Sequence, residues 1–214
     1  MMLCHFKTVF FFKGFFMMQK IFKVDVSPDV YQSQGRSFPF PDLTHTLCPQ
    51  CHKQHLHLHG FYRRYLIAKG FEGIILIRRY ICPDCGGTVS LLPWFCHPRR
   101  IYSMGFIHYS LSEFFGWSGT MVSFIRRFII NHGILFTRQL LYQYRKRILK
   151  NCNRIMMDLI RQFHPDGPIT ASLDNKKRVK DALKLIETAA PTPYSVSMDM
   201  FSHGFCTYLT LSAI

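Results

Sequence analysis

Residues 48–86 read CPQCHKQHLHLHGFYRRYLIAKGFEGIILIRRYICPDCG, and this stretch decides the fold of the first part of the chain. Each end is a Cys-x-x-Cys pair, Cys48 with Cys51 and Cys82 with Cys85. Two cysteines at this spacing can hold one edge of a metal ion, and two such pairs complete a tetrahedral four-cysteine site. Such a closed site leaves no open position for a substrate, so we predict a Zn²⁺ ion with a structural role.

Other side chains near the first pair offer alternative ligands. Four histidines follow it closely, and three of them alternate along a predicted strand and so share one face. Cys96 beside His97 is a looser alternative pair. The histidines are His52, His55, His57 and His59. The remaining cysteines are scattered singly, which favours metal binding in a reducing compartment over a disulfide framework, and we expect a cytoplasmic, nucleoid-associated protein.

The segments between the cysteine pairs predict a two-stranded hairpin. Residues 56–67 and 73–81 are rich in branched and aromatic residues and are too short for typical helices, and a glycine-containing turn separates them at 68–73. In residues 90–100 two prolines favour an extended connector. We therefore place a small β-rich zinc ribbon at 47–100.

Residues 1–46 are interpreted as a Phe-rich lead followed by a Pro-rich linker. The lead, residues 1–26, reads as a strand or an extension, because Lys13 and Lys20 interrupt its apolar runs before they reach the ~18 residues that span a bilayer. Attachment to a membrane surface is the alternative for this segment. Residues 27–46 contain three prolines and many small polar residues, which are typical of a linker.

After residue 101 the apolar period changes to that of helices. We predict helices at 104–115, 119–131 and 137–163, with Ser118 as the N-cap of the second and with Val122, Ile125 and Ile129 on its buried face. The first two helices and the GWSG turn fit a helix-turn-helix, with Leu111, Phe115, Trp117, Val122 and Ile125 as packed positions, Ser112 as the small residue and Gly116 in the turn. The fold class is thus α+β: a zinc ribbon, a helix-turn-helix domain at 101–164 with a long basic third helix, and a C-terminal tail at 165–214 whose role the sequence does not indicate.

The charge of the chain points to an anionic partner. Lys and Arg number 27 against 12 Asp and Glu, a formal net charge of +15, and residues 101–154 contain eight basic residues and one acidic residue. In a helix-turn-helix the outer face of the second helix enters the major groove, while neighbouring cations hold phosphates. The predicted DNA contacts are Ser118, Thr120, Ser123, Arg126, Arg127, Arg145, Lys146, Arg147 and Lys150. Phe124 on this outer face is inconsistent with it, and a helical hairpin that merely packs is the structural alternative.

The combination of CPQC, LHLHGFYRRY, IRRYICPDCGGTVSLLPWF and the two helices resembles the N-terminal recognition region of bacterial insertion-sequence transposases and related stand-alone zinc-ribbon proteins. The resemblance covers roughly residues 40–135. It implies recognition of duplex DNA, typically at the ends of a mobile element. The resemblance does not extend to the catalytic domain of those transposases.

Strand transfer of the common type needs three carboxylates around two divalent metals. The acidic residues after residue 135 are crowded into some forty residues without a series of strands, so we do not expect an enzyme. We expect DNA as the partner, a separate transposase chain as a second one, and neither a small-molecule substrate nor a membrane. The alternatives are a truncated fragment of a transposase, a zinc-stabilised protein-binding module, or an RNA-binding module that stacks bases on Phe61, Tyr62 and Tyr65.

Overall fold

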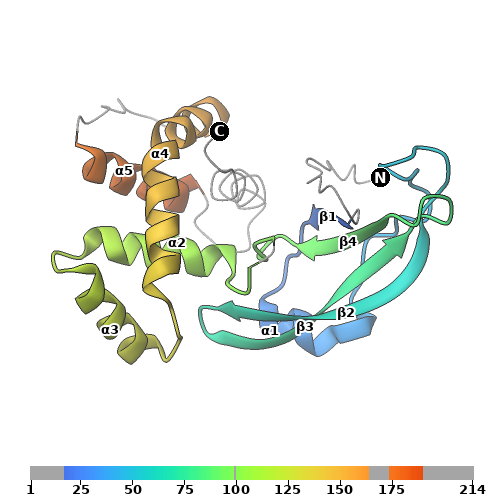
Figure 1. Ribbon diagram of the computed structural model, residues 1–214, viewed down its shortest axis with the longest axis horizontal. Coiled ribbons are helices and arrows are strands. Elements are labelled where there is room, and N and C mark those ends of the chain that lie inside the picture. The colour runs from blue at the N-terminus through green and yellow to red at the C-terminus, as the bar shows by residue number, and fades with distance from the viewer. Residues whose placement is uncertain (1–16, 99, 164–173, 190–214) are drawn as a thin grey trace. The chain divides into compact units, whose positions relative to one another are not determined.

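The computed structural model describes residues 17–98, 100–163 and 174–189, which form a mixed α+β structure of two units, 1–103 and 104–214. Within these described residues, the first unit contains four strands, one α-helix and a short 3-10 helix at Gly35–Ser37, and the second contains four α-helices (Figure 1). The strands are β1 (Met17–Phe22), β2 (His57–Ala68), β3 (Phe71–Ile81) and β4 (Thr88–Pro93). The helices are α1 (Pro28–Gln34), α2 (Met104–Gly116), α3 (Met121–His132), α4 (Arg138–Phe163) and α5 (Asn175–Ala189).

The four strands make one sheet in the order β1-β4-β3-β2. Strands β2 and β3 pair antiparallel along their whole length, and a two-residue turn closes them after the Ala68 and Phe71 pair. Gly70 in this turn has φ of 75°, a left-handed conformation that glycine adopts without steric cost. The predicted hairpin is therefore present, with strand bounds that differ by one or two residues.

The end of the first unit corrects the predicted connector. Residues 88–93 form β4, which pairs antiparallel with β3 and parallel with β1. Its side chains from Val89 to Pro93 are all buried, so this segment is a central strand. The prediction took the prolines as evidence for a connector, but Pro93 is the last residue of the strand and does not interrupt it.

The predicted linker is also wrong, because residues 28–34 form α1. Pro28 begins this helix, where its missing N–H costs nothing, and Gly35 ends it with φ of 52°. Tyr31 is buried, and its hydroxyl donates to the carbonyl of Leu76 at 2.8 Å, while Gln32 donates to the carbonyl of Ile74 at 2.9 Å. The helix thereby covers a length of β3 that β4 does not pair with. Strand β1 agrees with the strand reading of the lead; residues 1–16 lie outside the described residues.

The helices of the second unit begin and end close to the predicted positions. In α4, Leu141, Tyr144, Ile148 and Ile155 form a buried apolar stripe at helical spacing. Helix α5 lies within the predicted C-terminal tail and packs against α4 and α2. The rest of that tail lies outside the described residues. Within the described ranges, no helix combines the length and the apolar character that crossing a membrane requires.

Helix α3 presents a different face from the predicted one. Phe124 and Phe128 are its buried residues, whereas Val122 is 45% exposed and Ile125 and Ile129 are partly exposed. Its N-cap is Thr120, not Ser118, because the Thr120 side chain accepts a hydrogen bond from the Ser123 N–H. The two phenylalanines are one turn apart and bury larger surfaces than valine or isoleucine, so they decide which side of the helix faces inward.

Candidate metal centre and basic helical surface

The four cysteines of the two pairs form one compact cluster. Their sulfur atoms all lie within 4.8 Å of one another, and two contacts run between the pairs: Cys48 Sγ to Cys85 Sγ is 3.7 Å and Cys51 Sγ to Cys82 Sγ is 3.6 Å. The β2–β3 hairpin produces this meeting, because the first pair lies before β2, the second follows β3, and His57 is the partner of Ile81 in the register. Four thiols in this arrangement could bind a metal ion.

The two cysteine pairs have the same backbone geometry. The N–H of His52 donates to the carbonyl of Cys48 at 2.9 Å, and the N–H of Gly86 donates to the carbonyl of Cys82 at 3.0 Å. Each of these donors follows the second cysteine of its pair and has a left-handed backbone, with φ of 56° and 66°. Two turns that share this hydrogen bond and this left-handed residue thus bring four sulfur atoms together.

Backbone N–H groups stabilise negative charge on the cluster. Hydrogen bonds from the N–H groups of Cys85 and Asp84 lower the pKa of Cys82 to about 7. The N–H of Gln50 likewise points to Cys48 Sγ at 3.4 Å. These donors favour the thiolate form of Cys82, which is the form that binds metals, whereas burial raises the pKa of Cys85 to about 12.

The alternative ligands do not join this cluster. Among the described residues, the four cysteines are the one group of three or more side chains with atoms close enough to hold a metal. His52, His55, His57 and His59 are exposed. Cys96 and His97 are buried in the core of the first unit, where burial raises the pKa of Cys96 to about 12, which disfavours a thiolate.

The paired arginines of the hairpin have structural roles. The Arg78 guanidinium lies 4.6 Å from the centre of the Phe61 ring, and that of Arg79 lies 4.7 Å from the centre of the Tyr62 ring. Phe61 also packs edge-on against Phe40. These cation–π pairs account for the Arg-Arg pair of β3, and they cover a face of two of the rings that the RNA alternative requires for stacking.

The basic residues of α3 and α4 form the second candidate site. Arg126, Lys146 and Lys150 are exposed, and none of them forms an ion pair with a carboxylate of the described residues. Arg145 and Arg147 are partly buried beside them on α4. Lys146 and Lys150 lie one turn apart on the side of α4 opposite its buried stripe, so these two cations face outward together.

The predicted contacts in the turn have other partners. Thr120 and Ser123 cap α3, and the Ser123 hydroxyl also accepts a hydrogen bond from Trp117 Nε1 at 3.3 Å. Arg127 lies over the Trp117 ring, with its guanidinium 4.8 Å from the ring centre. Ser118 is exposed. Three of these four predicted DNA contacts, Thr120, Ser123 and Arg127, thus make contacts within the turn and the start of α3.

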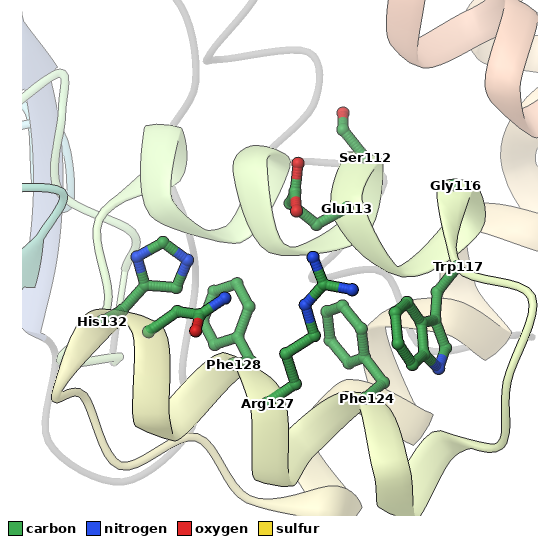
Figure 2. A pocket seen from close by; sticks show the side chains of 9 residues that line it. Ser112, Glu113, Gly116, Trp117, Phe124, Arg127, Phe128 and His132 are labelled. Atoms are coloured by element: carbon green, nitrogen blue, oxygen red, sulfur yellow. The ribbon is translucent and has the colours of Figure 1, made fainter.

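Helices α2 and α3 enclose a groove that the sequence did not predict. The contacts between their rings run along both helices, from Phe114 against Phe124 to Tyr109 against His132. A cavity of about 320 Å³ lies between the helices (Figure 2). Its lining residues are Ser112, Glu113, Gly116, Trp117, Phe124, Arg127, Phe128, Asn131 and His132. The sequence did contain one indication of this groove. Its spacing places Phe124, Phe128, Asn131 and His132 on one helical face.

Comparison with known proteins gives one match. A family model described as a domain of unknown function (DUF6431) matches residues 48–123, about a third of the chain. The matched segment begins at the first cysteine of the cluster and ends in the first turn of α3. No curated protein and no solved structure matches the chain.

Proposed function

We propose that this chain is a zinc-stabilised protein that binds duplex DNA and is related to the recognition regions of insertion-sequence transposases. The observation that carries the proposal is the exposed pair of cations Lys146 and Lys150 on one side of α4, together with the exposed Arg126 on α3, all three without carboxylate partners among the described residues. Closely spaced cations repel one another, so such a surface is favoured when a phosphate backbone neutralises it.

Zinc is the metal that fits the cysteine cluster best. A tetrahedral ion with metal–sulfur bonds of about 2.3 Å separates its sulfur atoms by about 3.8 Å. The distances from Cys51 Sγ to Cys82 Sγ and from Cys48 Sγ to Cys85 Sγ, 3.6 and 3.7 Å, are close to this value. Four thiolates are the donor set of structural zinc sites, and the bound ion would link the two ends of the hairpin and supply folding energy.

The mode of DNA binding follows from where the cations lie. We assign the contacts to the DNA backbone to Lys146 and Lys150 of α4 and to Arg126 of α3, because phosphate contacts position a protein without reading sequence. The helix-turn-helix reading assigns base contacts to the outward side of α3 and to the turn before it, where Arg126 and Ser118, respectively, are exposed. The contact between α2 and α3 is equally compatible with a helical hairpin that merely packs. The reading of bases by α3 therefore needs a separate test.

The test of DNA binding is a salt titration of the affinity for a labelled duplex, measured by fluorescence anisotropy. The K146Q/K150Q variant removes two exposed charges from α4, and K177Q/K180Q removes two exposed charges from α5 as a matched control. We expect the α4 variant to bind more weakly and to reduce the slope of log affinity against log salt by about 2, since each phosphate contact contributes about 1. Equal effects of the two variants would contradict the assignment to α4.

A second measurement tests sequence recognition and the relation to mobile elements. The zinc-loaded protein is used to retain sheared genomic DNA from its source at ~150 mM salt, near physiological ionic strength, and the retained fragments are sequenced. Enrichment of a shared motif at the ends of one mobile element would support the transposition reading. Uniform recovery of all fragments would leave binding without sequence recognition.

A further inference from the structure

The groove between α2 and α3 is a preformed cavity with one rigid aromatic wall. Trp117 is held on three sides: its Nε1 donates to Ser123 Oγ at 3.3 Å, Arg127 covers its ring, and Gly119 leaves it room. A Cβ atom at Gly119 would lie 2.5 Å from Trp117 Nε1, so a side chain there would displace the indole. The local sequence therefore fixes the position of this ring before any ligand binds.

The rest of the groove combines aromatic rings with a few polar groups. The rings of Phe124 and Phe128 form its inner part, and Arg127 extends from α3 toward Glu113 on α2 (Figure 2). The volume of about 320 Å³ is near the lower end of the range for small-ligand pockets, which are mostly apolar with few polar groups. The groove is thus suited to a flat group with a polar edge.

The charges at the groove exclude two ligand classes. Glu113 is the one acidic residue of residues 101–154, and it lines this groove, so its carboxylate would repel an anionic group such as phosphate. The Arg127 guanidinium would repel a simple cation and already lies over the Trp117 ring. A neutral planar ring with both hydrogen-bond donors and acceptors can pair with the carboxylate and with the guanidinium at once.

We propose that this groove receives an unpaired nucleobase of a bound strand. The base would stack against the aromatic and guanidinium surfaces of the groove, its amino or imino hydrogens would donate to Glu113, and its phosphates would remain outside near Arg126, which is exposed on the same helix. This inference rests on the proposed function, because it names the part of a nucleic acid that the groove would take. It adds recognition of unpaired or extruded bases to the backbone grip of α4.

The fluorescence of the full-length, zinc-loaded protein reports on the groove directly. The chain has two tryptophans, and Trp94 is 3% exposed with its Nε1 bonded to the carbonyl of Val24 at 2.7 Å. Quenching by an added ligand therefore comes from Trp117, and a W117F variant verifies this assignment. The probes are a short single-stranded oligodeoxynucleotide, the same strand with abasic sites in place of its bases, and the corresponding duplex.

We expect saturable quenching by the single strand, little by the abasic strand, and none in W117F. The E113Q variant, which changes an exposed position without loss of volume, should weaken quenching by the single strand by about tenfold while duplex anisotropy stays unchanged. Equal quenching by the abasic strand, or binding of the single strand without quenching, would overturn the proposal. Quenching by an aromatic peptide and not by the single strand would also overturn it and assign the groove to a protein partner. If the single strand does not quench Trp117 while salt-dependent duplex binding remains, this inference alone is contradicted. If the protein binds no nucleic acid at all, the proposed function is contradicted as well.

Discussion

His52 and Gly86 occupy the same position in the two cysteine turns, and both have a left-handed backbone, with φ of 56° and 66°. Each donates its N–H to the carbonyl of the first cysteine in its own turn, at 2.9 and 3.0 Å. Glycine adopts this conformation freely, whereas a side chain at such φ costs about 1–2 kcal/mol. One turn is therefore relaxed and the other is strained, although both hold sulfur atoms of the same cluster.

We predict opposite effects of substitutions at these two positions. Gly86→Ala should destabilise the first unit by about 1 kcal/mol, and because an added Cβ would meet nothing within 4 Å, the cost is in the backbone alone. His52→Gly should stabilise it by up to about 1 kcal/mol, partly offset by the greater freedom of glycine in the unfolded chain. Denaturant unfolding of the zinc-loaded protein measures both. A loss of the same size for each substitution would show that the turns are not equivalent.

A second prediction concerns the metal content of the chain. We expect one zinc ion per wild-type chain in native mass spectrometry and none in Cys82→Ser, because a structural site needs all four thiolates. Cys96→Ala is the matched control, since Cys96 is equally buried in the same unit but lies outside the cluster. A metal ion retained by Cys82→Ser, or lost from Cys96→Ala, would contradict the four-cysteine assignment. Chelation of the wild type should likewise lower the stability of the hairpin.

The parts of the fold that the sequence predicted are those encoded locally. The β2–β3 hairpin joins neighbouring segments through a two-residue turn, and its register brings together cysteines that the spacing alone identified. The three helices from 104 to 163 have a strong apolar period and clear ends, such as Gly133 with φ of 64°. In each case the physical cause lies within a few residues of the feature that it determines.

The parts that the sequence did not predict depend on distant partners. Strand β4 is central because β1 pairs with it in parallel across about seventy residues, and no local pattern reports such a pairing. Helix α1 is stable because Tyr31 and Gln32 reach the carbonyls of β3, which a count of prolines does not reveal. The inward face of α3 follows from rings on α2, so Phe124 was assigned to the wrong side and the groove that it lines was missed.

A third prediction separates two neighbouring arginines of β2. Arg64 Nη2 donates to the carbonyls of His97 and Arg100, at 2.5 and 2.6 Å, while Arg63 is exposed. Arg64→Ala should destabilise the protein by about 2–3 kcal/mol, because it leaves two carbonyls without a charged donor. Arg63→Ala should stay within about 0.5 kcal/mol of the wild type. Equal changes in the denaturation midpoint would contradict a structural role for Arg64.

The last prediction concerns the pH dependence of the contact between α2 and α5. His108 on α2 lies 3.2 Å, through Nε2, from the carbonyl of Leu183 on α5, and its Nδ1 is 4.0 Å from the Glu187 carboxylate. Burial lowers the pKa of His108 below its ordinary value of 6.5, against the opposing effects of Leu183 and Glu187. The folded protein therefore holds this imidazole neutral, with Nε2–H as the donor to Leu183.

The sign of the effect follows from which state binds the proton more tightly. Below about pH 6.5 the unfolded chain takes up the proton more readily than the folded chain does, so stability is full above this pH and falls as the pH falls toward the lowered pKa. We expect the wild type to lose more stability than His108→Gln between about pH 7.5 and about 5.5, since glutamine can donate to Leu183 without titrating. Denaturant unfolding followed by far-ultraviolet circular dichroism measures the difference, with His57→Gln on β2 as an exposed control. If His108→Gln and the wild type lose the same stability over this range, protonation of His108 does not cause the loss of stability in acid.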